Sequence, residues 1–516
     1  MKGLAFMKSY HELKSGSDVR GYASDIFGNE IELTDKAVYD ITAAFVPFLS
    51  KKSGKEPGTL TVSVGHDSRI TAERIKAQVI SALCDAGVSV IDCGLSSTPA
   101  MFMTTVMAGC DGAVQITASH HPADRNGLKF FLPSGGLDPE DIAEILNGAE
   151  QGDKAPAAKG SVTARDFMDE YSKMLRDLIC KELGAADGEQ PLAGYHIVVD
   201  AGNGAGGFYA EKVLAPLGAD TSGSVYLEPD GMFPNHIPNP ENEAAMASIS
   251  DAVLSSGADL GVIFDTDVDR AGCVDPDGVE INRNRLVALA AAIVLENEPG
   301  ATIVTDSVTS SGLKTFIEKN LGGHHHRFKR GYKNVINEAE RLCREGVNAP
   351  LAIETSGHAA LKENYFLDDG AYLITKIIIK MAKLGREGKS ISDLTASLKM
   401  PVEAKELRFN ILVDDFRSYG ECVIEGLQRW CSAKSDLGFK IADDNREGIR
   451  VSVDDGWFLL RLSVHDPVMP MNIESDKKGG VREILGMIAE FFYGCRFLDT
   501  DGLRLYLSES ESEDIQ

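Results

Sequence analysis

The sequence predicts an α/β protein with three similar α/β domains, each built on a mixed sheet, and a smaller C-terminal α+β domain. Two observations lead to this prediction. The length of 516 residues exceeds one compact domain, since domains average ~150 residues. A weak internal repeat then divides most of the chain into three units with the same order of strands, loops and helices.

The repeat begins with a β-branched, apolar strand that ends in aspartate and continues through small residues into a helix. Asp67, Asp200 and Asp306 mark this point in the three units. Each unit then has a second apolar strand that ends in a polar loop, within residues 112–122, 260–270 and 351–361. Open α/β sheets bind ligands at the carboxyl ends of strands, so these loops are the candidate functional segments.

Changes in composition indicate where the domains meet. Residues 148–160 are small, polar and turn-rich, which is typical of a linker. Beyond residue 401, strand-like and helix-like segments mix as in a small α+β domain. We therefore expect α/β domains at residues 1–155, 160–282 and 283–400, an α+β domain at residues 401–507, and an acidic tail at residues 508–516.

The composition excludes several classes of partner. Asp plus Glu total 78 against 52 for Lys plus Arg, so the formal net charge is −26. A chain this acidic repels a phosphate backbone, so we expect no nucleic-acid partner. No apolar run approaches the ~20 residues of a membrane span, and the nine cysteines lack C-x-x-C spacing. We expect a cytoplasmic monomer or homodimer with no membrane partner.

The loop DTDVDR supplies the sharpest chemical signal. Asp265, Asp267 and Asp269 follow an apolar strand within one short loop. Three carboxylates so close together repel each other unless a hard cation lies among them, and Mg²⁺ suits oxygen ligands. Arg270 can bind a phosphate or balance the charge. An EF-hand does not fit, since Arg270 replaces the turn glycine and Pro276 the final glutamate. The plain alternative is a solvated acidic turn.

The loop TASHHP places Ser119 at a strand end, with His120 next to it and Lys129 further on. Such a serine can act as a nucleophile or phosphate carrier, and it can equally cap a turn. The G-x-S-x-G pattern of a serine hydrolase is missing from the sequence.

The loop ETSGH offers Glu354, Ser356 and His358 after a strand. A carboxylate, a hydroxyl and an imidazole suit the vicinal hydroxyls of a sugar, and an ordinary polar loop would also contain them.

Two further patterns are weaker. The glycines at 202, 204 and 207 match a dinucleotide-binding G-x-G-x-x-G, but glycine-rich turns from strand to helix are common. The run His324–His326 could bind a metal, and we expect it to form an exposed basic loop.

Four motifs in order resemble those of the α-D-phosphohexomutase superfamily, which includes phosphomannomutase/phosphoglucomutase and phosphoglucosamine mutase. TASHHP resembles its phosphoserine loop, DTDVDR its magnesium loop and ETSGH its sugar-recognition loop, while SGSDVRG near the start resembles its N-terminal segment. The resemblance covers nearly the whole chain. It implies an active site in a central cleft.

The resemblance also implies a mechanism. A phosphorylated Ser119 gives its phosphoryl group to a hexose phosphate, the bisphosphate reorients, and the other phosphate returns to Ser119. Mg²⁺ bound by Asp265, Asp267, Asp269 and the Ser119 phosphate neutralises charge. A hexose 1,6-bisphosphate is the implied activator.

The same resemblance assigns the remaining site residues. Arg20, His120 and Lys129 surround the transferring phosphate, and one of them assists the proton. Arg270, Lys333, Glu354, Ser356 and His358 are the expected contacts of the sugar phosphate.

The fourth domain departs from the family pattern. The family carries a phosphate loop resembling R-x-S-x-T-E-P, whereas this chain reads RLSVHDP. Arg461 and Ser463 remain as donors for the distal phosphate. His465 replaces the threonine and Asp466 the glutamate, and His465 would bind phosphate better when protonated.

We therefore expect a phosphohexomutase that acts on mannose or glucose phosphates. The alternatives are a phosphoglucosamine mutase, a phosphatase of the haloacid dehalogenase type with Asp265 as nucleophile, and a phosphosugar-binding homologue without turnover.

Overall fold

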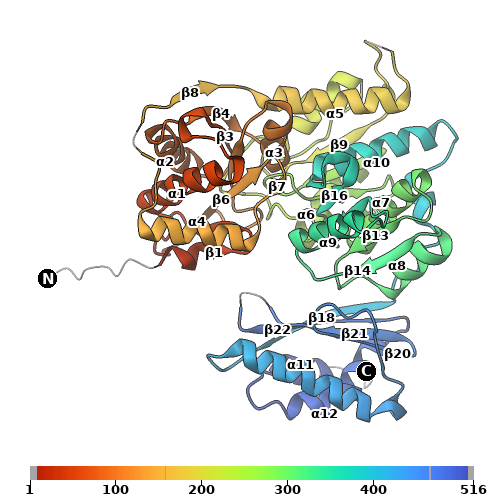
Figure 1. Cartoon of the computed structure of the whole chain (residues 1–516). Coiled ribbons are helices and arrows are strands. Elements are labelled where there is room, and N and C mark those ends of the chain that lie inside the picture. Colours follow the sequence, from red (N-terminus) through yellow and green to blue (C-terminus); the bar gives the residue numbers. More distant parts are fainter. Residues whose placement is uncertain (1–8, 157, 187, 464–465, 509–516) are drawn as a thin grey trace. The chain divides into compact units, whose positions relative to one another are not determined.

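The computed structural model describes residues 9–156, 158–186, 188–463 and 466–508. The chain divides into two compact units. The first comprises Met1–Ile293 and Ser356–Leu394, and the second comprises Val294–Thr355 and Thr395–Gln516. The chain thus passes between the units three times, after residues 293, 355 and 394. Figure 1 shows the helices and strands of both units.

The N-terminal part of the first unit is an eight-stranded mixed sheet in the order β1-β2-β6-β5-β3-β4-β8, with short β7 beside β6. Strands β5, β3, β4 and β8 run parallel, whereas β1, β2, β6 and β7 join through antiparallel pairs. The elements of this part are β1 (Lys14–Ser15), β2 (Asp18–Tyr22), α1 (Asp35–Ser53), β3 (Thr61–His66), α2 (Ala72–Asp85), β4 (Ser89–Leu95), α3 (Thr98–Met107), β5 (Gly112–Ile116), β6 (Arg125–Leu132), β7 (Gly135–Gly136), α4 (Pro139–Gln151), β8 (Ser161–Ala164) and α5 (Phe167–Leu183).

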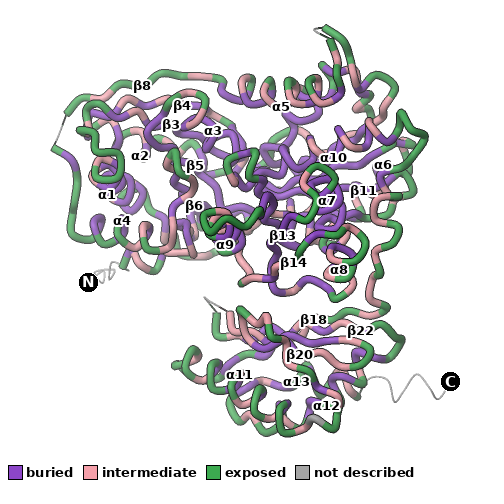
Figure 2. The backbone as a smooth tube through the Cα atoms, turned by 45° about the vertical axis from the view of Figure 1, so that its right-hand side comes forward, coloured by how far each residue is buried: buried purple, intermediate pink, exposed green. Residues whose placement is uncertain are grey.

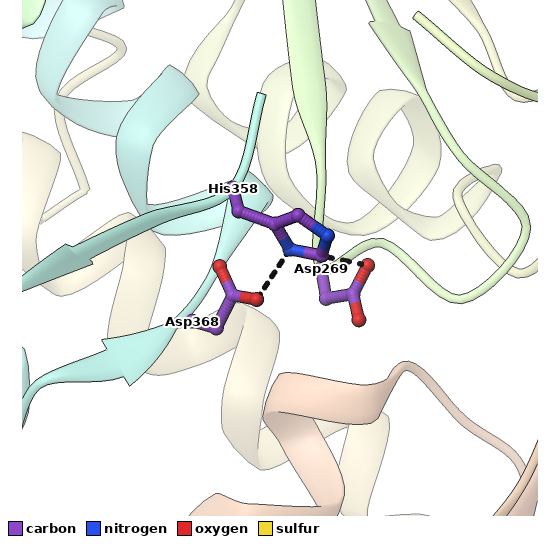
Figure 3. Close-up of side chains that lie close together, drawn as sticks. All are labelled: Asp269, His358 and Asp368. Atoms are coloured by element: carbon purple, nitrogen blue, oxygen red, sulfur yellow. Dashed lines mark hydrogen bonds and ion pairs between the residues drawn. The ribbon is translucent and has the colours of Figure 1, made fainter. Parts of the chain in front are cut away.

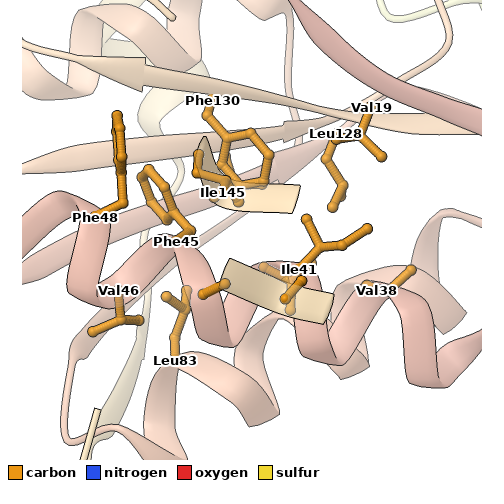
Figure 4. Close-up of a cluster of buried hydrophobic side chains, with 14 of the residues drawn as sticks. Val19, Val38, Ile41, Phe45, Val46, Phe48, Leu83, Leu128, Phe130 and Ile145 are labelled. Carbon is orange, nitrogen blue, oxygen red and sulfur yellow. The ribbon is translucent and has the colours of Figure 1, made fainter. Parts of the chain in front are cut away.

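Helix α1 illustrates how sequence signals set an element of this sheet domain. The Thr34 side chain accepts a hydrogen bond from the backbone N–H of Ala37, which caps the first turn, and Gly54 ends the helix with a φ of 70°. The apolar face packs on the sheet, where the rings of Phe45 and Phe130 lie 4.7 Å apart. Figure 4 shows this cluster of buried side chains.

A second mixed sheet in the first unit has the order β12-β11-β10-β9. Strand β10 is parallel to β9 and antiparallel to β11. All five residues of β10 are buried, which explains its uninterrupted apolar sequence LGVIF. The elements are β9 (Ile197–Asp200), α6 (Glu243–Ser256), β10 (Leu260–Phe264), β11 (Ala271–Val274), β12 (Glu280–Ile281) and α7 (Arg283–Asn297).

The returning segment Ser356–Leu394 completes the first unit. It contains the antiparallel pair β16 (Ala359–Leu361) and β17 (Leu367–Asp368), followed by α10 (Gly370–Gly385). The hydroxyl of Tyr171 on α5 donates to Asp369 Oδ1 at 2.7 Å, and Lys383 Nζ on α10 lies 2.9 Å from Glu182 Oε2. Helix α10 is therefore bonded to α5 at both of its ends.

The second unit has two groups of strands. Strands β14, β13 and β15 are parallel, and β18-β22-β21-β20-β19 form an antiparallel sheet. The elements are β13 (Thr302–Thr305), α8 (Ser311–Thr315), β14 (His324–Arg327), α9 (Tyr332–Arg344), β15 (Leu351–Ile353), β18 (Glu403–Asn410), α11 (Phe416–Ala433), β19 (Lys440–Ile441), β20 (Ile449–Val453), β21 (Gly456–Leu460), β22 (Val468–Ser475), α12 (Gly480–Tyr493) and α13 (Asp501–Ser508).

The histidine run corrects one expectation. His324, His325 and His326 belong to strand β14 and are not an exposed basic loop. His325 Nε2 lies 2.8 Å from Thr305 Oγ1, and His326 Nε2 lies 2.8 Å from Glu338 Oε1. Pairing with β13 and these side-chain partners explain why three adjacent histidines form a strand.

The predicted α/β class, with mixed sheets and a smaller α+β domain, is confirmed. Figure 2 shows β8, at one end of the first sheet's strand order, as exposed, whereas most residues of β3 and all of β5 are buried. Among the residues that the structure describes, no helix is both long and apolar enough to cross a membrane. Ser508, the first residue of the tail predicted at 508–516, ends α13, and residues 509–516 lie outside the described residues.

Candidate active site

Two strand ends in the first unit bring the serine loop and the aspartate loop together. Ser119 follows β5, and Asp265 follows β10. The hydroxyl of Ser119 lies 3.2 Å from Asp265 Oδ2, and only 4% of Ser119 is exposed. Both loops were predicted separately from the sequence, and the fold places them in direct contact.

The backbone at Ser119 has a left-handed conformation, with a φ of 50°. This conformation is uncommon for a residue other than glycine and needs support from its surroundings. The Thr117 hydroxyl oxygen supplies part of that support by accepting from the Ser119 N–H at 2.9 Å. The Thr117 hydroxyl in turn donates to Asp67 Oδ2 at 2.7 Å.

Arg69 supplies the rest of the support and was not predicted as a site residue. Its guanidinium donates to the carbonyl oxygens of Pro122 and Arg125 at 2.7 and 2.9 Å and to that of His121 at 2.6 Å. It also donates to the carbonyl oxygen of Ser119 itself. The fully buried side chain lies 3.3 Å from Asp67 Oδ2. Arg69 therefore fixes the course of the whole serine loop.

The three aspartates of the second loop converge on one point. A carboxylate oxygen of each of Asp265, Asp267 and Asp269 lies within 4.8 Å of the others, and all three residues are buried. Between them, Val268 has a φ of 68°, which is strained for a β-branched residue. The solvated acidic turn that the sequence left open does not fit this buried loop.

Two cations pair with the carboxylates. Lys129 Nζ lies 3.2 Å from Asp267 Oδ2 and also contacts Asp269. Arg270 Nε lies 3.1 Å from Asp265 Oδ2, while its Nη2 donates to the Ser119 hydroxyl oxygen at 3.1 Å. Arg270 therefore connects the aspartate loop directly to the serine.

The carboxylates still have capacity for a metal ion. The buried Asp267 Oδ1 and Asp269 Oδ1 have no hydrogen-bond partner among the described residues. Asp267 Oδ2 accepts from the Thr98 hydroxyl, and its carbonyl oxygen accepts from the Thr98 N–H at 2.8 Å. Such second contacts orient a ligand. A set made only of oxygens fits Mg²⁺ better than a softer metal.

The pKa values of the aspartates move in opposite directions. Burial raises the pKa of Asp265 well above its usual range, and the charge of Asp269 raises it further, although Arg270 opposes this. Burial would also raise the pKa of Asp269, but Lys129, His358 and Arg270 outweigh it and lower that pKa. Three carboxylates in one site repel each other and so resist full ionisation, and a bound cation would reduce this repulsion.

His120 lies against the serine hydroxyl. Its Nδ1 is 3.3 Å from Ser119 Oγ and 2.6 Å from Arg270 Nη2. Arginine can only donate, so Nδ1 is the acceptor in the second contact. Burial lowers the pKa of His120, and Arg270 lowers it further, so the imidazole is neutral near pH 7.

Arg20 lies on β2, where its Nη2 donates to Asp18 Oδ2 at 2.8 Å. Arg20 pairs with Gly127 of β6, whose carbonyl oxygen accepts from the Thr117 N–H at 3.2 Å, so Arg20 lies close to the serine loop. Its role beside the transferring phosphate, which the resemblance implied, stays a prediction.

His358 lies half-buried between two carboxylates (Figure 3). Its Nδ1 contacts Asp368 and lies 4.0 Å from Asp269 Oδ1. Burial alone would lower the pKa of His358, but Asp368 and Asp269 raise it to about 9. The sequence indicated a sugar contact for His358, and it gave no functional signal for Asp368, which precedes the N-cap residue of α10.

The glycine-rich turn after β9 has a packing role. An added Cβ at Gly204 would lie 2.6 Å from the carbonyl oxygen of Thr266, and one at Gly207 would lie 2.4 Å from that of Leu227. Gly204 thus allows the turn to approach the aspartate loop closely. This contact explains the glycine pattern without a dinucleotide.

The other predicted residues lie in the second unit, apart from Ser356, which begins the returning segment of the first. Glu354 Oε1 accepts from the Gly331 N–H at 2.6 Å, and Lys333 lies in the first turn of α9. Arg461 follows β21, and Ser463 Oγ accepts from the Asp466 N–H at 3.3 Å. His465 lies outside the described residues.

Glu447 is a further residue that the sequence analysis missed. Its Oε1 lies 4.0 Å from Arg461 Nη1, and its Oε2 accepts from the Ser307 hydroxyl at 2.6 Å and from the Arg330 N–H at 3.1 Å. It lies in a polar turn between β19 and β20, and nothing in that turn distinguished it from its acidic neighbours.

Comparison with protein families gives three consecutive matches. Residues 13–156, 169–278 and 282–400 match alpha/beta/alpha domains I, II and III of phosphoglucomutase/phosphomannomutase. A phosphomannomutase/phosphoglucomutase of Pseudomonas syringae is 32% identical over 83% of this chain and 85% of that protein. A phosphoglucomutase of Neisseria gonorrhoeae is 30% identical over 88% of this chain and 92% of that protein.

Solved structures agree with these matches. A phosphoglucomutase/phosphomannomutase family protein from Burkholderia thailandensis superposes with a TM-score of 0.76 at 26% identity, covering 94% of this chain and 97% of that one. An N-acetylphosphoglucosamine mutase of Aspergillus fumigatus, solved with GlcNAc-6P and magnesium, has a TM-score of 0.56 at 12% identity, covering 94% and 96% of the two chains. The second likeness concerns the fold alone.

Proposed function

Because the chain belongs to the phosphoglucomutase/phosphomannomutase family of the α-D-phosphohexomutase superfamily, we propose that it interconverts hexose 1-phosphates and hexose 6-phosphates. The enzyme is an intramolecular phosphotransferase that works through a phosphoserine and a bisphosphorylated sugar. Mannose and glucose phosphates are the proposed substrates, since the relatives carry both names. A phosphoglucosamine mutase is less favoured.

The observation that carries this proposal is the position of Ser119. Its hydroxyl lies 3.2 Å from Asp265 and 3.1 Å from Arg270, in a loop that Arg69 holds in a left-handed conformation. A phosphate carrier needs a fixed oxygen beside groups that stabilise charge, and this serine has both.

The transfer follows from these groups. The oxygen of a sugar hydroxyl forms a bond to the phosphorus while the bond between phosphorus and Ser119 Oγ breaks. The proton of the sugar hydroxyl passes through a base to Ser119 Oγ, which leaves as a hydroxyl. Of Arg20, His120 and Lys129, the imidazole of His120 is neutral and lies 3.3 Å from Ser119 Oγ. Arg270 and Lys129 hold positive charge beside the transferring group. The second half reverses these steps with the other phosphate.

Asp265, Asp267 and Asp269 are the proposed Mg²⁺ ligands, together with the phosphate on Ser119. The ion would supply positive charge that stabilises the transferring phosphoryl group. The buried, unbonded oxygens of Asp267 and Asp269 support this assignment.

Further residues are proposed to bind the rest of the substrate. Arg461 and Ser463 would bind the distal phosphate, with His465 as a further donor. Lys333, Glu354, Ser356 and His358 are proposed as contacts of the sugar. The predicted domain boundaries, the cytoplasmic location and the monomeric or dimeric state stay predictions.

The decisive experiment replaces the proposed carrier. Ser119→Ala should lower turnover of glucose and mannose 1-phosphates by several orders of magnitude, in a coupled assay with Mg²⁺ and a trace of the 1,6-bisphosphate. Wild-type protein should gain one phosphate in intact-mass spectrometry and the variant none, while the exposed Ser134→Ala should behave like wild type. Turnover by Ser119→Ala near the wild-type rate would reject the assignment.

Ser119→Ala and Asp265→Asn together separate the rival reactions. A phosphatase with Asp265 as nucleophile would retain phosphate release in Ser119→Ala and lose it in Asp265→Asn. A non-catalytic phosphosugar-binding protein would bind hexose phosphate and release neither isomer nor phosphate.

A further inference from the structure

The carboxylate of Glu447 occupies a group of anion-binding donors in the second unit. Its Oε2 accepts from the Ser307 hydroxyl at 2.6 Å and from the Arg330 N–H at 3.1 Å. Its Oε1 faces the Arg461 guanidinium at 4.0 Å. A hydroxyl, a backbone N–H and a guanidinium are the donors that proteins use for phosphate.

The strand register explains why Glu447 faces Arg461. Ile449 of β20 pairs with Leu460 of β21, so the residues just before Ile449 lie beside Arg461. Gly448 has a φ of 58°, and a Cβ there would lie only 2.0 Å from the Leu460 carbonyl oxygen. This tight glycine turn fixes Glu447 next to the arginine.

The backbone around Arg330 is also arranged for anions. The N–H groups of Arg330 and Gly331 are consecutive, and they donate to Glu447 and Glu354 respectively. Gly331 has a φ of 115°, which lets the two N–H groups turn toward their carboxylates. Successive backbone N–H groups form anion-binding sites in proteins, phosphate sites among them.

We propose that Glu447 is an internal anion that occupies the distal phosphate clamp, and that the phosphate of the substrate must displace its carboxylate from Arg461 and the Arg330 N–H. This inference rests on the proposed role of Arg461 in the phosphohexomutase reaction. Glu447 then limits the affinity of the clamp, because a dianionic phosphate and a carboxylate repel each other at one arginine.

Contacts of other residues keep the turn in place when the Glu447 carboxylate is displaced. Arg450 stacks on the Trp457 ring at 3.5 Å and donates to the Ser307 carbonyl oxygen at 3.1 Å. Arg327 Nη1 lies 3.7 Å from Asp444 Oδ2 in the same turn. Displacement of Glu447 is therefore a local movement of one side chain.

The test is Glu447→Gln in the full-length protein. Glutamine keeps an oxygen that accepts from Ser307 and Arg330, but it removes the negative charge. We expect the variant to bind inorganic phosphate about three- to tenfold more tightly by calorimetry, a gain of ~0.7–1.4 kcal/mol. The KM for hexose phosphate should fall by a similar factor. The matched control Asp443→Asn removes a charge from an exposed position in the same turn and should leave both values unchanged.

A double variant assigns the effect to the clamp. In the Arg461→Ala background, Glu447→Gln should give no gain in phosphate affinity, because the arginine that the carboxylate neutralises is gone. Unchanged or weaker phosphate binding by Glu447→Gln would overturn the inference, as would a gain that persists without Arg461. Phosphate binding is measured without turnover, so the binding result decides the role of Glu447 by itself. A protein that interconverts no hexose phosphate would refute the proposed function and leave that binding result valid.

Discussion

Replacing Arg69 by methionine should disable the serine loop without touching a reacting group. Arg69 donates to four carbonyl oxygens between Ser119 and Arg125 and pairs with the buried Asp67. Methionine fills a similar volume and supplies none of these bonds. The loop would lose its anchor, and the carboxylate of Asp67 would lose its cation.

The expected magnitude follows from these contacts. Breaking a buried ion pair by removing one partner costs about 3–5 kcal/mol. Each buried carbonyl left without a donor costs ~1–3 kcal/mol more, so the loop should move toward water instead of keeping its shape. A displacement of ~1 Å at a reacting group can reduce turnover about 10²-fold. We therefore expect Arg69→Met to lose at least this factor in kcat.

Three measurements check this prediction. Coupled kinetics give kcat, intact mass after incubation with hexose 1,6-bisphosphate gives the phosphorylation of Ser119, and hydrogen exchange reports opening of residues 117–125. The matched control is Arg74→Met, because Arg74 is partly exposed and also donates to backbone carbonyls, those of Ala23 and Leu33. Turnover within threefold of wild type, with unchanged exchange in the serine loop, would refute the argument.

Three more predictions test other parts of the chain. Asp267→Asn should raise the Mg²⁺ concentration for half-maximal activity by at least ~10-fold, and full activity in excess chelator would contradict the metal assignment. Gly204→Ala should lower turnover, because its Cβ would lie 2.6 Å from the Thr266 carbonyl oxygen and push the aspartate loop; wild-type kinetics would show that the loop tolerates the shift. Burial raises the pKa of Glu474 to about 7. Between pH 4.5 and 7 the folded state therefore keeps a proton that the unfolded chain loses. The free energy of unfolding falls as pH rises through this range. Glu474→Gln keeps an acceptor for Trp457 Nε1, so thermal unfolding should show a gain of about 1–2 kcal/mol above pH 7 and little change below pH 4.5; an equal gain at both pH values would exclude the titration.

The sequence predicted the fold class and the loops that meet in the first unit because both depend on local patterns. One short segment of sequence contains both an apolar strand and the aspartates that follow it, Asp265, Asp267 and Asp269. Another contains Ser119 beside His120. The contact between the two loops depends on which strand ends adjoin, and the sequence supports it only through the family resemblance.

The residues that the sequence did not reveal act at long range in the chain. Arg69 binds a loop some fifty residues away, and its own segment looks like an ordinary strand end. Asp368 contacts His358 because β16 and β17 pair, and Glu447 faces Arg461 because of the register between β20 and β21. Their partners are set by the tertiary fold. The histidine run was predicted wrongly because composition favoured a loop, whereas pairing with β13 makes it a strand.

The discontinuous first unit has a consequence for biosynthesis. Residues 1–293 leave the ribosome well before residues 356–394. Yet α10 and its N-cap residue Asp369, in the later segment, supply the partners of Tyr171, Tyr209 and Glu182. Until α10 arrives, the apolar surface that it covers stays open to solvent. A chain truncated after residue 293 should therefore aggregate or be degraded, even though it contains both the serine and the aspartate loops. The aspartate loop, moreover, receives His358 only when that later segment has been made.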